Sequence, residues 1–318
     1  MNVVRETLCR LGGIPRQILP VGAIAALLIL RASSAAQDSR GLIDSRESLY
    51  NNIYVYRQGN YVSMTFGHNR VLYTESVYNS LDERELPVTY TQYMTASLMY
   101  PKKIGSVLEI GFGGGRTAWY LHRFLPNVPI TSVELDPAVV ALARKHFGIK
   151  EEPNFHLVTS DGRMFLANSK TRYDIILIDA YRGPFVPFHL LTKEFYRLVK
   201  DHLTEGGVVA QNVEPSTMLF DSAVKTMQAV FSQVDFYEAG GNIVSIAYEG
   251  GPRSVDELER VARERQAALR LRYELAPMLQ HRRRLLSDTI EAKAKLLTDD
   301  FAPVETLKAV ERHNRKWQ

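Results

Sequence analysis

The stretch Ser106–Gly115, with the sequence SVLEIGFGGG, decides the fold class of this chain. The largely apolar run Val107–Ile110 leads directly into a glycine-rich turn, which is typical of a buried strand followed by a helix. Glycines let the backbone approach a ligand closely and leave amide groups free at the start of the helix, where carboxylate, phosphate or sugar oxygens are favoured. We therefore predict a cofactor-binding turn in which Gly111, Gly113 and Gly115 are the binding residues.

Short apolar strands alternate with amphipathic helices from Ser106 onward. This order builds a parallel sheet with helices on both faces. One helix start is marked by Asp136 and Pro137, a cap and first-turn pair. The prediction is an α/β fold with a Rossmann-like sheet of seven strands: Val107–Ile110, Ile130–Val133, Phe155–Val158, Asp174–Ile178, Val208–Gln211, Val234–Tyr237 and Ile243–Ala247.

A small β element is predicted ahead of the Rossmann-like domain, which we assign to residues 101–251. Within residues 45–100, hydrophobicity alternates with a period of two over 51–74, which predicts an antiparallel meander of three strands. A helix follows over 89–99. No strand or helix of the core is predicted before Asn51.

The last segment, residues 252–318, is rich in charge. Ser254 and Glu257 form a capping box that opens a helix. We predict a helical appendage that is kinked at Pro277, runs toward Leu297 and contains no strand.

Residues 1–36 have the layout of a secretory leader. Arginines precede an apolar run over 20–30, and the small residues of 32–36 follow. The apolar run is shorter than the roughly 20 residues that a spanning helix needs. The alternatives are a leader, a loose membrane anchor and an extension that is disordered or docks on the core.

Composition narrows the classes of function. The chain has 318 residues, 45% of them hydrophobic, and can bury a large core. Lysine and arginine number 39 against 35 acids, so no nucleic-acid partner is expected, and the basic cluster 281–284 is interpreted as a solvated helix face. Cys9 is the only cysteine and the histidines lack ligand spacing, so neither a disulfide nor a metal site is predicted.

Acidic residues stand at the ends of three further predicted strands. Glu134 lies 23 residues after Gly111, where an acid can accept both hydrogens of a ribose diol. Asp161 is placed to accept the adenine amino hydrogen, and Gly162 leaves room for the ring. Asp179 ends the fourth strand. Open parallel sheets bind ligands at this rim, so the acids are predicted to line one site, although each could also cap a helix or a turn.

Five motifs in order resemble the spermidine synthase family of polyamine aminopropyltransferases: Val107–Gly115, Ser132–Pro137, Asp161–Arg163, Tyr173–Asp179 and Thr192–Tyr196. The resemblance implies a methyltransferase-type sheet and a transferase. It also implies that Glu134 holds the ribose of the cofactor and Asp161 the adenine. Asp179 would be the catalytic acid that positions the attacking amine and helps to deprotonate it.

The chain departs from the family pattern on the substrate side. Gly114 stands where the family has an aspartate that holds the terminal amine of the cofactor, and Arg182 stands where it has a second acid. A Tyr-His-Glu element is matched only by Tyr90-Thr91-Gln92. We therefore take Gln92, Tyr181 and Arg182 as acceptor-side candidates in a pocket that suits a polyammonium substrate poorly.

The resemblance implies transfer of an aminopropyl or related alkyl group to a small-molecule amine, with decarboxylated S-adenosylmethionine or S-adenosylmethionine as cofactor and no metal. The alternatives are a methyltransferase that uses S-adenosylmethionine and a catalytically silent binding protein that keeps the fold. We further expect a homo-oligomer. Its expected location is the cytoplasm, with membrane contact through residues 1–36, and the alternative is export through a signal peptide.

Overall fold

A computed structural model describes residues 41–68, 71–183, 185–217, 219–283 and 294–300. By its internal contacts the chain divides into Met1–Ser39 and Arg40–Gln318, and the described residues all lie in the second unit. The leader predicted at residues 1–36 and the lone Cys9 lie outside the described residues. Within the described ranges, no helix combines the length and apolar character needed to cross a membrane.

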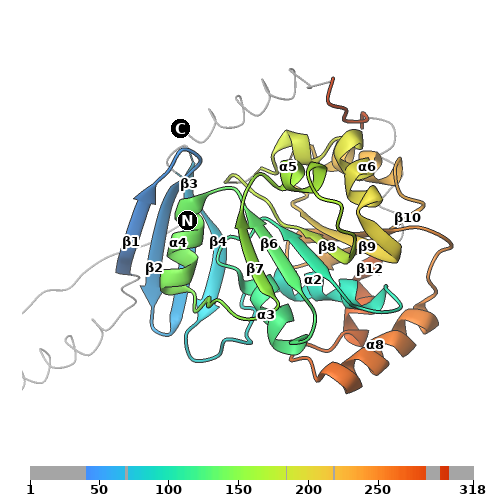
Figure 1. Cartoon of the computed structure of the whole chain (residues 1–318), viewed down its shortest axis with the longest axis horizontal. Coiled ribbons are helices and arrows are strands. Elements are labelled where there is room, and N and C mark those ends of the chain that lie inside the picture. Colours follow the sequence, from blue (N-terminus) through green and yellow to red (C-terminus); the bar gives the residue numbers. More distant parts are fainter. Residues whose placement is uncertain (1–40, 69–70, 184, 218, 284–293, 301–318) are drawn as a thin grey trace, which may run out of the picture. The chain divides into compact units, whose positions relative to one another are not determined.

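A large sheet forms the centre of the described chain, with eight strands in the order β12-β10-β11-β9-β8-β5-β6-β7 (Figure 1). The five strands from β9 to β7 are parallel, and the other three pair antiparallel. All seven predicted strands and the α/β class are confirmed. Their bounds are β5 Val107–Ile110, β6 Ile130–Glu134, β7 Phe155–Thr159, β8 Tyr173–Ile178, β9 Leu203–Val213, β10 Gln233–Ala239 and β11 Asn242–Tyr248.

The predicted count of seven strands is too low, because Arg282–Arg283 forms the short edge strand β12 beside β10. Two arginines carry no strand pattern. A tertiary ion pair holds the segment instead: Nη2 of Arg282 lies 2.8 Å from Oδ2 of Asp235, and both side chains are buried. The same Asp235 oxygen accepts a hydrogen bond from Tyr100, so the buried charges are paired as burial requires.

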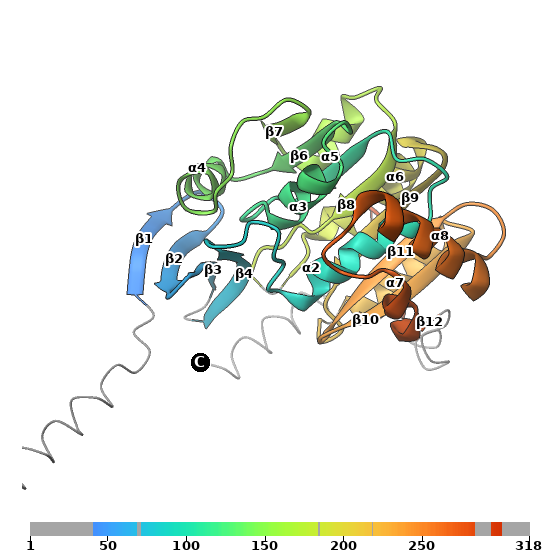
Figure 2. The same cartoon turned by 90° about the horizontal axis from the view of Figure 1, so that it is seen from below.

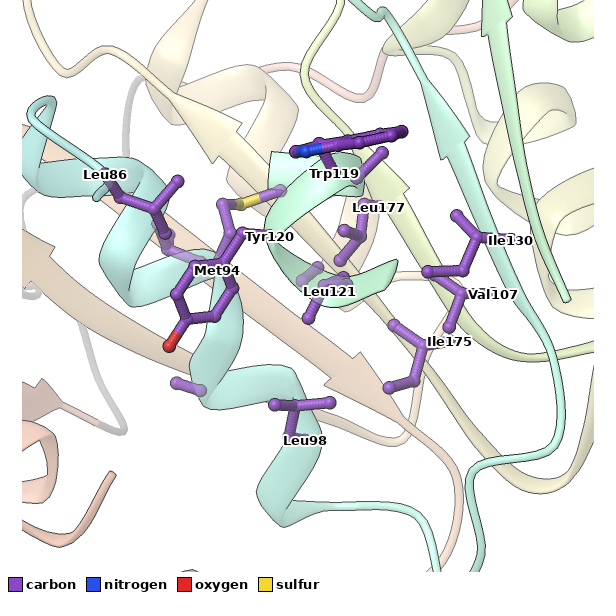
Figure 3. Close-up of a cluster of buried hydrophobic side chains, with 14 of the residues drawn as sticks. Leu86, Met94, Leu98, Val107, Trp119, Tyr120, Leu121, Ile130, Ile175 and Leu177 are labelled. Carbon is purple, nitrogen blue, oxygen red and sulfur yellow. The ribbon is translucent and has the colours of Figure 1, made fainter. Parts of the chain in front are cut away.

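Helices cover both faces of the large sheet, and successive strand residues point to opposite faces. Leu177 packs into the cluster on the face of α2, α3 and α4, whereas Ile176 and Ile178 pack into the other cluster with α5, α6 and α7. Figure 3 shows Leu177 in the first cluster with Trp119 and Tyr120 of α3. The helix bounds are α2 Thr89–Met94, α3 Arg116–Phe124, α4 Pro137–His146, α5 Gly162–Ala167, α6 Lys193–Asp201 and α7 Phe220–Gln228.

A second, antiparallel sheet consists of β1 Gly41–Glu47, β2 Asn52–Gln58, β3 Tyr61–His68 and β4 Val71–Asn79 (Figure 2). The predicted meander is present, but β1 was missed, and the prediction that no element begins before Asn51 is wrong. Side chains of α4 secure β1: Asp44 lies 2.7 Å from Nζ of Lys145 and 2.8 Å from Nε2 of His146. His146 and Lys145 lower the pKa of Asp44, and these ion pairs join the small sheet to α4 of the large domain.

The described part of the C-terminal segment is less helical than predicted. Ser254 caps α8, Val255–Leu269, by accepting a hydrogen bond of 3.1 Å from the Glu257 amide, as the capping box predicts. The helix stops at Leu269 because Arg270 adopts the left-handed conformation (φ 53°). Pro277 lies in the short 3-10 helix η3, Ala276–His281. The predicted absence of a strand is wrong because of β12, and the predicted helix is interrupted after Leu269, while residues 284–293 and 301–318 of the predicted appendage lie outside the described residues.

Candidate active site

A cavity of about 850 Å³ opens at the carboxyl ends of the parallel strands. Its lining includes Gly111 after β5, Glu134 at the end of β6, Asp161 after β7 and Asp179 after β8. The residues that were predicted from separate strand ends therefore meet in one space, at the rim where open parallel sheets bind ligands. Aromatic and aliphatic side chains of η2 (Phe188–Leu190) also line this cavity.

The glycine turn has the strained backbone that only glycine adopts easily. The φ angles of Gly111, Gly113 and Gly115 are 91°, 52° and 70°, in the region that side chains disfavour. A Cβ atom on Gly111 would lie 2.4 Å from the carbonyl oxygen of Asp179. Gly111 and Gly113 line the cavity, but Gly115 does not, contrary to its predicted binding role. Its φ angle instead lets the chain enter α3, with its amide 2.7 Å from the Phe112 oxygen.

The Glu134 carboxylate braces this turn from the next strand. Its Oε2 accepts hydrogen bonds from the amides of Phe112 (3.0 Å) and Gly113 (3.1 Å), and its Oε1 accepts one from Asp136 (2.9 Å). Burial raises the pKa of Glu134, while these backbone donors act against that rise. A carboxylate offers about four acceptor positions, so these three donors leave about one of them open on a residue that lines the cavity.

Asp161 combines a structural role with a place on the cavity wall. It caps α5 by accepting a hydrogen bond of 2.9 Å from the Met164 amide. Its other oxygen lies 3.0 Å from Nε2 of His189, and this partner is the main reason that the pKa of Asp161 is lowered. A Cβ atom on Gly162 would lie 2.2 Å from the Ile110 side chain, so glycine keeps α5 close to β5.

Asp179 is the most strongly perturbed of the predicted site acids. Its Oδ2 accepts a hydrogen bond of 3.1 Å from the Tyr90 hydroxyl, and its Oδ1 accepts one of 2.9 Å from Nδ2 of Asn212. Burial raises the pKa of Asp179 to about 6, although the hydrogen bonds from Asn212 and Tyr90 lower it. The two donors fix the plane of the carboxylate, and the raised pKa makes it a better proton acceptor than an ordinary aspartate.

The acceptor-side candidates have different outcomes. Tyr181 and Arg182 both line the cavity, with Tyr181 donating a hydrogen bond of 3.0 Å to the Asn212 oxygen and Arg182 exposed. Gln92 does not line it, because its Nε2 donates to the Leu86 oxygen at 2.7 Å. Of the Tyr90-Thr91-Gln92 element, Tyr90 is the residue that lines the cavity.

The sequence did not predict several residues that line the cavity or that donate hydrogen bonds to its acidic side chains. Asn212, at the end of β9, follows no motif. Glu75 and Ser76 come from β4 of the small sheet and line the cavity with Tyr90. Among the described residues, no three or more His, Cys, Asp and Glu side chains are grouped so that they could hold a metal ion.

The parallel sheet, the glycine turn and the acids at successive strand ends define a Rossmann-like α/β protein of the methyltransferase type. The solved structure of a probable spermidine synthase from Corynebacterium glutamicum has the same fold, with a TM-score of 0.63 and 18% identity, and the match covers 83% of this chain and 98% of that one. Human methyltransferase-like protein 13, solved in complex with SAH, gives a TM-score of 0.53 at 22% identity, over 57% of this chain and 92% of that one.

The sequence comparisons are more specific than the fold. Residues 89–245 match the model of the spermine/spermidine synthase domain. A polyamine aminopropyltransferase of Vibrio vulnificus is 28% identical over 303 residues, which cover 92% of this chain and 99% of the relative. Together these comparisons support the spermine/spermidine synthase family that the motifs predict.

Proposed function

We propose that this enzyme transfers an aminopropyl group from decarboxylated S-adenosylmethionine to a small-molecule amine. The observation that carries the proposal is the position of Asp179, which lines the same cavity as Glu134 and Asp161 and is held by two donors. The similarity to polyamine aminopropyltransferases supports it.

The order of the acids along the rim gives the cofactor an orientation. Asp161 would accept a hydrogen bond from the adenine amino group, and Glu134 would accept one from a ribose hydroxyl. This orientation directs the sulfonium end of the cofactor toward Asp179. Glu134 would accept its hydrogen bond through the acceptor position that the turn amides leave open. Gly111 and Gly113 line the cavity without side chains, which fits the close approach of a sugar.

Asp179 would act on the acceptor amine. An alkylammonium has no lone pair and cannot attack, so the acceptor must first lose a proton, which Asp179 receives and passes to solvent. The neutral nitrogen then bonds to the carbon beside sulfur, the carbon–sulfur bond breaks, and its electron pair neutralises the sulfonium as the thioether leaves. Positioning of the two substrates in the cavity provides much of the rate.

Product analysis tests the proposal. Purified protein with decarboxylated S-adenosylmethionine and putrescine should yield an aminopropylated amine and 5'-methylthioadenosine in equal amounts. Ordinary S-adenosylmethionine serves as the competing cofactor. A methylated product with that cofactor, and none with the decarboxylated one, would contradict aminopropyl transfer.

Methyl transfer from S-adenosylmethionine is the second candidate because Gly114 removes the turn aspartate that the family uses for the terminal amine. The adenosyl part of the site would serve either cofactor. Homo-oligomerisation and membrane contact or export through residues 1–36 stay predictions.

A further inference from the structure

Glu75 is an acid of the cavity to which the reaction above gives no role. It lies on β4 of the small sheet and lines the cavity together with Glu134 and Asp179. Its Oε1 atom is buried and has no hydrogen-bond partner in the described part of the chain. A buried carboxylate oxygen without a donor destabilises the empty protein, so a bound molecule is the natural source of the missing donor.

The charges around Glu75 favour a cation. Burial raises the pKa of Glu75 well above its ordinary value, and the negative charges of Asp179, Glu134 and Glu214 raise it further, in that order. Glu75 is therefore within electrostatic range of both the ribose-side acid and the catalytic acid. A ligand ammonium at this place would gain a charge-assisted hydrogen bond and would also reduce the repulsion among the acids.

The packing of β4 on the glycine turn shows why the acid comes from the small sheet. The Ser76 hydroxyl accepts a hydrogen bond of 2.8 Å from the Gly114 amide. A Cβ atom on Gly114 would lie 2.7 Å from Cβ of Ser76 and 2.7 Å from the Phe147 ring. The turn therefore has no room for an acidic side chain at position 114, and the strand that fills the space carries Glu75 as the preceding residue.

We propose that Glu75 binds a primary alkylammonium group of the substrates. The inference rests on the proposed aminopropyl transfer. Two groups have this chemistry: the ammonium at the end of the aminopropyl chain, and the second ammonium of a diamine acceptor. Ordinary S-adenosylmethionine would bring a carboxylate toward Glu75, Asp179 and Glu134, so the same acid selects the decarboxylated cofactor.

Calorimetric titration of the full chain tests the first source of the ammonium. Glu75→Gln keeps the size of the side chain and removes its charge. Affinity for decarboxylated S-adenosylmethionine should fall at least about tenfold, while affinity for 5'-methylthioadenosine, which lacks the ammonium, should stay unchanged. Glu75→Asp, with a shorter charged side chain, should lie between the two. Glu47→Gln changes an exposed acid of β1 in the same sheet and serves as the matched control.

Steady-state kinetics with putrescine test the second source. A KM for putrescine that rises at least about tenfold in Glu75→Gln, with unchanged cofactor affinity, would assign the acceptor ammonium to Glu75. Equal loss of affinity for both nucleosides would make Glu75 a residue of cavity shape and overturn the proposal, as would no change in any of the three measurements. A parent protein that binds the decarboxylated cofactor in a Glu75-dependent way but forms no product would contradict the proposed function alone.

Discussion

The hydroxyl of Tyr90 on α2 donates a hydrogen bond of 3.1 Å to the carboxylate of Asp179, which lies 89 positions later at the end of β8. This bond stabilises the ionised form of Asp179 and lowers its pKa against the effect of burial. A residue of the helix before the Rossmann-like sheet therefore contributes to the proton affinity of Asp179.

Tyr90→Phe should move the pH dependence of the reaction. If Asp179 must be ionised to accept a proton, the parent kcat/KM should rise with pH through about 6. Without the tyrosine donor the ionised form is less stable, so this limb should move to higher pH by about 1. Tyr93→Phe, on the same helix but outside the cavity, is the control. A limb that stays in place would separate Tyr90 from the titration of Asp179.

Asp179→Asn should keep the cofactor and lose turnover. The amide has nearly the same shape but accepts no proton, so kcat should fall by about a hundredfold or more. Calorimetry should show a cofactor affinity close to that of the parent. Turnover at the parent rate would make Asp179 a structural residue.

Glu134→Ala should weaken cofactor binding by at least about tenfold, because a charge-assisted hydrogen bond to the ribose is lost. The amides of Phe112 and Gly113 also lose their acceptor, so thermal stability should fall as well. Titration of a folded variant with 5'-methylthioadenosine measures the first effect. Unchanged affinity would limit Glu134 to its role in the turn.

Arg182→Asp should shift acceptor choice toward putrescine. The exposed guanidinium on the cavity wall repels a diammonium and suits an acceptor that also carries a carboxylate, such as ornithine. The ratio of kcat/KM for putrescine to that for ornithine should therefore rise in the variant. Arg172→Asp, an exposed arginine outside the cavity, is the control. An unchanged ratio would show that residue 182 does not meet the acceptor.

Glu109→Gln should reduce the pH dependence of stability. Burial raises the pKa of Glu109 in β5 to about 8, although the Ser132 hydroxyl acts against the rise. The folded state thus favours the protonated acid, and its contribution to stability is lost as pH rises from about 4.5 toward and through 8, at about 1.4 kcal/mol for each pKa unit. Melting temperatures across this range should fall less in the variant. Parallel curves would contradict a buried, protonated Glu109.

Local pattern predicts seven of the eight strands of the large sheet but misses β12, and it misses β1 of the small sheet. All four residues of β5 are buried. In the sequence, Ser106 precedes this largely apolar run and Gly111 follows it, so both ends of Val107–Ile110 can be recognised. Most side chains of β1 are exposed, so Gly41–Glu47 has no alternation to detect. β12 depends on the contact between Arg282 and Asp235, which no local pattern contains.

Site residues that follow directly after a strand of the large sheet could be predicted from the sequence. Site residues that tertiary packing brings to the cavity from another element could not. Strand ends placed Glu134 and Asp179 correctly on the cavity. Helical residues two positions apart point about 200° apart, which explains why Tyr90 faces the cavity while Gln92 does not. Glu75 arrives from another sheet, and no spacing in the sequence relates it to the glycine turn.

The cavity takes Glu134, Asp161 and Asp179 from strand ends of the large sheet and Glu75 from the small one. The acids on the two sides of the cavity therefore come from separate stretches of the sequence. Substitutions at Glu75 and its neighbours on β4 should therefore alter ammonium recognition while Glu134, Asp161 and Asp179 stay unchanged. A combinatorial library limited to β4 is accordingly a direct search for altered ammonium recognition.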